Sequence, residues 1–163
     1  MDAGTLINVF SQTFSVDPAP RKQAEEYLKQ AALQPGYTTS VLTLVAQADV
    51  PEQVRLAAAV NFKNQVKFHW VASEEDGSVS GPDFVIPDAE KAAVKQNIVG
   101  FMLAAPPLVQ AQVSETLALI SASDFPTSWT TLLPELVARL NSAGQDYGVI
   151  NSVLSTANII FKR

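Results

Sequence analysis

Apolar residues recur every three to four positions along almost the whole chain, in segments that are separated by proline or glycine. This spacing places apolar side chains along one face of an α-helix. The clearest series lies between residues 51 and 70 and consists of Val54, Ala58, Phe62, Val66 and Trp70. No segment with alternating apolar residues competes with the pattern. The spacing therefore predicts an all-α fold, with Phe62 buried between helices.

Proline, glycine and capping residues divide the chain into eight predicted helices. Asp17-Pro18, for example, is an N-cap followed by proline in the first helical position. The first five helices are expected at about 5–15, 18–33, 37–48, 51–70 and 87–104. The next two open at Pro106-Pro107 and at Asp124-Phe125-Pro126, and the last follows Gly144.

Taken in pairs, these helices form a repeat. The first helices of the four pairs start near residues 5, 37, 87 and 125, at intervals of 32, 50 and 38. The middle interval is lengthened by residues 71–86, where Glu74-Glu75-Asp76-Gly77 predicts a flexible, solvated loop. A helix pair every 30 to 40 residues or so is typical of an α-solenoid. Weak identity between the pairs favours HEAT-type units.

The last two helices carry specific expectations. In the seventh, Pro134 should lie in the first turn, where proline is best tolerated, and the buried stripe is predicted as Leu133, Leu136, Val137 and Leu140. The eighth carries more apolar residues than one face can bury, namely Val149, Val153, Leu154, Ile160 and Phe161. Because terminal solenoid repeats normally have a polar outer face, we expect residues 1–163 to be part of a longer array, with several of these side chains exposed.

Composition excludes several kinds of site. The chain has no cysteine and one histidine, which excludes disulfides, thiolate nucleophiles and Cys-ligated or clustered-His metal sites. His69 has no recognisable catalytic partners and is expected at a surface or an edge. The run Glu74-Glu75-Asp76 lacks the alternating spacing of a calcium loop, and no glycine-rich phosphate loop is present. We therefore expect no active site, no cofactor and no metal, with Trp70 and Trp129 as core anchors.

The net charge of -5 makes nucleic acid an unsuitable general partner. Residues 96–114 are uncharged, but Pro106-Pro107 interrupts them and leaves too short an apolar run for a bilayer. We interpret this stretch as two helix ends that meet at a turn, and expect no membrane insertion. Residues 1–20 do not resemble a secretory signal.

Two motifs resemble the importin-beta (karyopherin) family. The series Arg55-Leu56-Ala57-Ala58-Ala59-Val60-Asn61-Phe62-Lys63-Asn64, followed by Trp70, is similar to the signature of its amino-terminal domain. Asp124-Phe125-Pro126 with Trp129 and Leu132-Leu133-Pro134-Glu135-Leu136 resembles the fourth helix pair of that family. The resemblance covers nearly the whole chain and is weakest in residues 71–86, where the loop is longer than the usual connection.

The resemblance implies a nuclear transport receptor that shuttles between nucleus and cytoplasm. It implies Ran in its GTP form as a partner, importin-alpha as exported cargo, and contact with nuclear pore proteins. Candidate Ran contacts on the second helices of the first two pairs are Arg21, Glu25, Lys29, Val60, Lys63, Asn64 and Lys67. Asn64 can equally satisfy backbone groups between repeats. The alternative functions are another carrier of the family or a generic HEAT scaffold, such as a phosphatase regulatory subunit; an enzyme ranks third.

Overall fold

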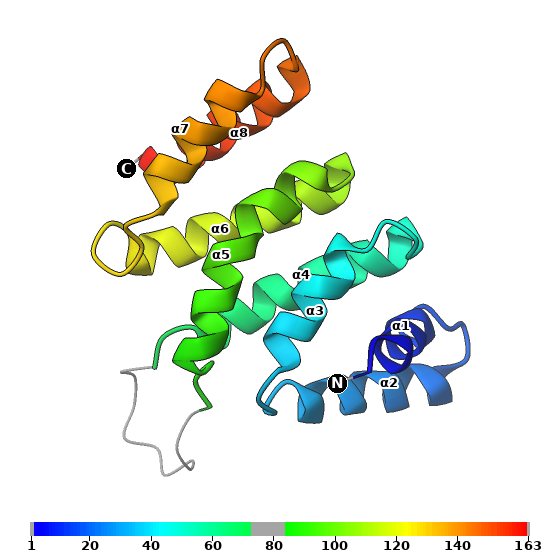
Figure 1. Cartoon of the computed structure of the whole chain (residues 1–163). Coiled ribbons are helices and arrows are strands. Elements are labelled where there is room, and N and C mark those ends of the chain that lie inside the picture. Colours follow the sequence, from blue (N-terminus) through cyan, green and yellow to red (C-terminus); the bar gives the residue numbers. More distant parts are fainter. Residues whose placement is uncertain (1, 73–83, 163) are drawn as a thin grey trace.

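The all-α prediction is confirmed. The computed structural model describes residues 2–72 and 84–162, and these form eight α-helices without a strand (Figure 1). The helices are α1 (Ala3–Gln12), α2 (Pro18–Ala31), α3 (Tyr37–Ala46), α4 (Glu52–His69), α5 (Asp88–Ala104), α6 (Pro107–Asp124), α7 (Leu132–Ser142) and α8 (Tyr147–Phe161). Most of the predicted loop at 71–86, including Glu74-Glu75-Asp76, lies outside the described residues.

The helix boundaries arise from local chemistry. The Asp17 carboxylate accepts a hydrogen bond from the Ala19 amide at 3.1 Å, so the predicted cap of α2 is confirmed. Gly36 precedes α3 with a φ of 88°, a conformation that glycine adopts without strain. The uncharged stretch 96–114 is two helices that meet at Ala105 and Pro106. Among the described helices, none combines the length and apolarity needed to cross a bilayer.

Consecutive helices form four pairs that stack in chain order from the N terminus to the C terminus (Figure 1). The second helices α4, α6 and α8 pack against each other in succession, and α3 packs against α5. The first pair contacts the second mainly through α1. The predicted stripe of α4 is buried as expected, and Phe62 is fully enclosed. One continuous apolar core therefore runs through all four pairs.

A charged cluster covers the buried Trp70 at the end of α4. The Lys91 and Lys95 ammonium groups lie 5.6 and 5.9 Å from the centre of the indole ring. Lys95 also donates to the Asp124 carboxylate at 2.7 Å and to the Ser128 carbonyl at 2.9 Å. Burial by itself raises the pKa of Asp124, but the hydrogen bond and charge of Lys95, together with the polar groups of Trp70 and Ser123, outweigh it, and the pKa is lowered. The pair therefore ties the middle of α5 to the end of α6.

The seventh helix differs from its prediction. Asp124 ends α6 instead of opening α7, residues 125–131 are turns, and α7 begins at Leu132. Pro134 lies in the first turn, as expected. The buried residues are Leu132 and Leu136, whereas Leu133 and Val137 are each 46% exposed. The predicted stripe was wrong at Leu133, where Leu132 is buried instead, and at Val137, because α7 packs onto α8 through the face that Leu132 and Leu136 share. Leu136 is buried as predicted, and Leu140 is half-buried.

The eighth helix has apolar residues on two faces. Val153 and Ile160 are buried, whereas Leu154, Ile159 and Phe161 are exposed. The expectation that several apolar side chains of this helix are exposed is therefore confirmed for Leu154 and Phe161. Both tryptophans are buried in the core, as predicted.

Candidate protein-binding surface

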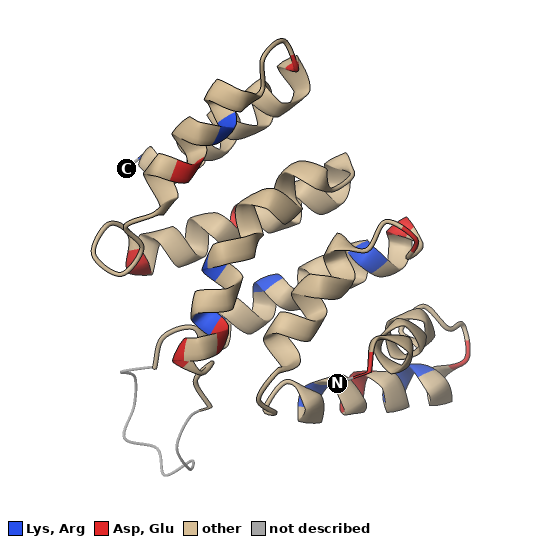
Figure 2. Ribbon diagram, in the orientation of Figure 1, with Lys and Arg blue, Asp and Glu red and all other residues tan. Residues whose placement is uncertain are grey.

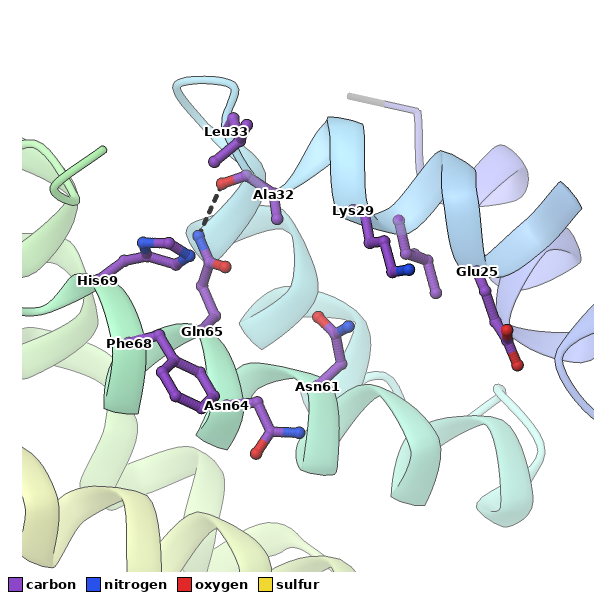
Figure 3. Close-up of a pocket in the computed structure, with 10 residues that line it drawn as sticks. Glu25, Lys29, Ala32, Leu33, Asn61, Asn64, Gln65, Phe68 and His69 are labelled. Carbon is purple, nitrogen blue, oxygen red and sulfur yellow. Dashed lines mark hydrogen bonds between the residues drawn. The ribbon is translucent and has the colours of Figure 1, made fainter. Parts of the chain in front are cut away.

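The helices α2, α4, α6 and α8 present a row of grooves, which we call the second-helix face. The first groove lies between α2 and α4, has a volume of about 410 Å³, and is lined by side chains of both helices (Figure 3). Three of the predicted contact residues line this α2/α4 groove: Glu25, Lys29 and Asn64. Arg21 lies one helical turn before Glu25, is half-buried and is not among the lining residues.

Amide side chains hold the wall of the α2/α4 groove in place. Gln65, which is buried, donates to the Ala32 carbonyl at the end of α2 at 2.8 Å (Figure 3). The Tyr37 hydroxyl donates to the Asn61 side-chain oxygen at 2.7 Å, and burial raises the pKa of Tyr37 far above its usual value. These bonds satisfy the carbonyl at the end of α2 and the hydroxyl at the start of α3. Gln65 and Asn61 are therefore structural members of the groove.

His69 lies at the end of the same groove, as an edge residue. Its Nδ1 is 3.0 Å from the Phe84 carbonyl oxygen, and because a carbonyl only accepts, Nδ1 is the donor. The two rings also meet edge to face, with centres 5.6 Å apart. His69 thereby joins the end of α4 to the chain that leads into α5. In the described residues, no three His, Asp or Glu side chains form a cluster that would hold a metal ion.

A second groove lies between α4 and α6, is closed at one side by α8, and has a volume of about 490 Å³. Lys63, Asn64 and Lys67 line it from α4, so Asn64 borders both grooves. Opposite them, the Glu115 carboxylate on α6 accepts from Lys63 at 3.0 Å. The remaining wall of this α4/α6 groove is apolar and consists of Ala118, Leu119 and Ile159.

The exposed residues of α4 differ in their surroundings. Lys67 has no carboxylate within salt-bridge distance among the described residues, and its ammonium lies 5.5 Å from the centre of the Phe68 ring. Phe68 is 65% exposed, so most of its ring is open to solvent. The Asn64 side chain is exposed and makes no hydrogen bond within the described part of the chain. Val60 is also exposed but lines neither groove.

Five of the seven predicted contact residues thus line two adjoining grooves, and Arg21 and Val60 do not. Four residues that were not predicted contribute as much to the grooves: Phe68, Glu115, Leu119 and Ile159. Three of them could have been predicted from the sequence. Phe68, Glu115 and Leu119 all fall outside the buried stripes of their helices. Leu119 and Phe68 in particular are apolar residues at positions that the helical period assigns to solvent.

Comparison with known proteins relates this surface to a family. The model of the importin-beta N-terminal domain matches residues 24–104. Exportin-2 of Oreochromis niloticus is 38% identical over 160 residues, which is 98% of this chain and 15% of that protein. Human exportin-2 is 36% identical over 159 residues, again 98% of this chain and 15% of the relative. The chain belongs to the importin-beta family.

A solved structure agrees with this assignment. The exportin Cse1, in its cargo-free, cytoplasmic state, matches all of this chain with a TM-score of 0.85 and 32% identity, and the match covers 16% of that chain. The importin-beta family resemblance and the HEAT-type solenoid of helix pairs are both confirmed. This chain spans about 15% of the length of the exportin-2 relatives it matches.

The importin-beta domain match includes α3, α4 and α5, whereas α6 and α8 lie beyond it. Within the matched part, the signature arginine has a structural role. Arg55 is 6% exposed, and its Nε donates to the Val45 carbonyl in the last turn of α3 at 2.8 Å. Charged donors near a helix C terminus satisfy free carbonyls and complement the helix dipole. Arg55 therefore fastens α4 to α3, and the residues available to a partner are those on its opposite face.

Proposed function

We propose that this chain is the amino-terminal part of a nuclear transport receptor that binds Ran in its GTP form and exports importin-alpha. The observation that carries the proposal is the convergence of Glu25, Lys29, Lys63, Asn64 and Lys67 on two adjoining grooves of the second-helix face. The relatives of this chain are named exportins. A carrier of that kind shuttles between the nucleus and the cytoplasm.

The mechanism that we propose is linkage between two ligands on one solenoid. Ran-GTP and cargo bind the same array of helix pairs, and each raises the affinity for the other by the same factor. The second-helix face of this chain supplies part of the Ran surface, with charged and amide groups at its rim. Because such groups act through screened electrostatics, the affinity should fall as salt is raised. Nuclear pore proteins are further partners in this proposal.

Binding of Ran loaded with GTP or GDP tests the proposal directly. We expect preference for the GTP form, because Ran's surface reorganises with the γ-phosphate. The double variant Lys63→Ala, Lys67→Ala should weaken binding of Ran-GTP without loss of helicity. The matched control is Lys22→Ala with Lys162→Ala, which removes two exposed lysines that line neither groove.

Two results would contradict the proposal. Equal binding of both nucleotide forms would leave a generic HEAT scaffold as the better function. Equal loss of binding in the groove variant and in the control variant would indicate that overall charge, and not the grooves, attracts Ran.

A further inference from the structure

The α4/α6 groove has a chemistry that Ran binding alone does not explain. It joins an apolar floor to a positively charged rim, in a chain whose net charge is -5. We infer that this groove binds an acidic amphipathic helix of a protein partner, with apolar side chains on the floor and a carboxylate at Lys67. Amphipathic helices commonly dock in this way, through anchors one helical turn apart. The inference is independent of Ran, and its test uses none.

The floor of the groove is made by side chains from two helices. Leu119 on α6 is 40% exposed and Ile159 on α8 is 45% exposed, and both line the same hollow of about 490 Å³. Single exposed apolar residues are normal on any surface. Here they converge in a concave site, with the small Ala118 beside them, and the volume lies in the range of ligand pockets. This floor therefore suits an apolar side chain of a partner.

The rim of the groove selects the charge of the partner. Lys63 is already paired with Glu115 at 3.0 Å, so these two groups nearly cancel. Lys67 has no such carboxylate in the described residues, and contact with the Phe68 ring holds its ammonium at the surface. The rim therefore keeps one uncompensated positive charge, which a carboxylate complements. A basic segment would be repelled by Lys67, and Glu115 would not offset this repulsion because it is already paired with Lys63.

The two neighbouring grooves lack this combination. In the α2/α4 groove, Glu25 and Lys29 stand one helical turn apart and neither forms a salt bridge among the described residues, so its uncompensated charges are of both signs. The groove between α6 and α8, of about 270 Å³, has several hydroxyl side chains in its lining and contains no lysine or arginine among its described lining residues. Of these three grooves, the one between α4 and α6 combines an apolar floor with an uncompensated charge that is positive only, because its carboxylate, Glu115, is paired with Lys63.

Fluorescence anisotropy with two designed peptides tests the inference on this chain. The first is a helical peptide of about 14 residues with Leu and Glu on one face at i, i+4 spacing, and the second has Lys at every Glu position. We expect the Glu peptide to bind at least about tenfold more tightly than the Lys peptide. Lys67→Glu should reverse this order, because it inverts the charge of the rim.

A second pair of variants tests the floor. The double variant Leu119→Ser, Ile159→Ser should weaken binding of the Glu peptide about tenfold or more. The matched control is Leu133→Ser with Val137→Ser, two apolar residues on α7 with similar exposure that lie outside the groove, and its affinity should stay unchanged. Circular dichroism confirms that all variants keep their helicity.

The inference is overturned if the chain binds neither peptide or binds both equally. It is also overturned if the floor variant binds like the wild type or if Lys67→Glu leaves the order of the two peptides unchanged. None of these results bears on the GTP dependence of Ran binding, so failure here and failure of the proposed function are separate outcomes.

Discussion

The contact between α4 and α6 and the contact between α6 and α8 are built from different residues, although both join second helices of neighbouring pairs. Phe62 and Val66 on α4 and Val113 and Leu117 on α6 are buried in one apolar core. Between α6 and α8, Ser114 and Thr156 instead meet at 3.4 Å, and both are buried. The apolar core continues into α8 through Val153 and Ile160, but its contact with α6 also contains buried hydroxyl groups.

Charged residues are also distributed unevenly among the second helices (Figure 2). Lysine, arginine and acidic residues lie along α2 and α4, whereas α8 carries none and α6 few. The hydroxyls of Ser152 and Thr156 on α8 make their shortest hydrogen bonds within their own helix, as when Thr156 donates to the Ser152 carbonyl at 2.8 Å, whereas their bonds to other helices are 3.3 to 3.4 Å long. Such bonds give little net stability between helices. On the second helices the charge therefore lies in the earlier pairs, and the hydroxyl groups that join the last pair to α6 add little to its attachment.

The largest expected effect comes from the apolar contact. Phe62→Ala should lower the free energy of unfolding by about 3–5 kcal/mol, because it removes a fully buried ring and leaves a cavity. Chemical denaturation followed by circular dichroism measures this loss. Lys67→Ala, on the exposed face of the same helix, serves as the control and should cost less than about 0.5 kcal/mol. Similar losses in the two variants would contradict the assignment of the faces of α4.

The next effect concerns the ion pair that joins α5 to α6. Asp124→Asn should cost about 1.5–3 kcal/mol, because the hydrogen bond from Lys95 loses its charged acceptor. The pKa of Asp124 is lowered in the folded chain, so its contribution is present above the unfolded pKa of about 4 and is lost as the pH falls through the folded value. Denaturation midpoints between neutral and acidic pH measure both effects.

The Asn variant also provides the control for the pH dependence. Its stability should fall less than that of the wild type below about pH 4, since the group that titrates is gone. Parallel pH profiles of the two chains would show that Asp124 does not contribute to acid sensitivity.

The smallest expected effect lies at the hydroxyl contact. Thr156→Val keeps the size of a buried side chain but removes the hydroxyl that meets Ser114, the Met102 sulfur and the Ser152 carbonyl. We expect a loss of about 1 kcal/mol or less, because these bonds replace similar bonds to water in the unfolded chain. The loss of unfolding free energy in Val113→Ala, at the apolar contact on α6, provides the comparison. A loss at Thr156 as large as that at Phe62 would mean that the hydroxyl groups add much to the attachment of the last pair.

Much of the fold could be predicted because helix formation is local. Proline, glycine and caps mark the ends of the helices, and the spacing of Val54, Ala58 and Phe62 identifies the buried face of α4. The prediction was wrong at α7, where the turns after Asp124 displaced the start of the helix and Leu132, not Leu133, became buried. Neighbouring leucines satisfy the same period, so only the partner helix selects between them.

The candidate site was predicted in part for the same reason. Lys63 and Lys67 were found because they lie opposite a buried stripe, which is a property of one helix. Glu115 follows Lys63 by 52 residues and Ile159 belongs to α8, so neither is related to α4 by any local pattern. Their positions depend on how the second, third and fourth pairs stack.

The sequence by itself determined that this chain is a series of paired helices, which side of most helices is apolar, and which family it resembles. The tertiary structure decided that Asn64 borders two grooves, that Lys63 is paired while Lys67 is not, and that Leu119 and Ile159 face one hollow. The physical reason is that helical period and capping act over one or two turns, whereas grooves form where side chains from separate helices meet, and that meeting is set by the packing of the whole array.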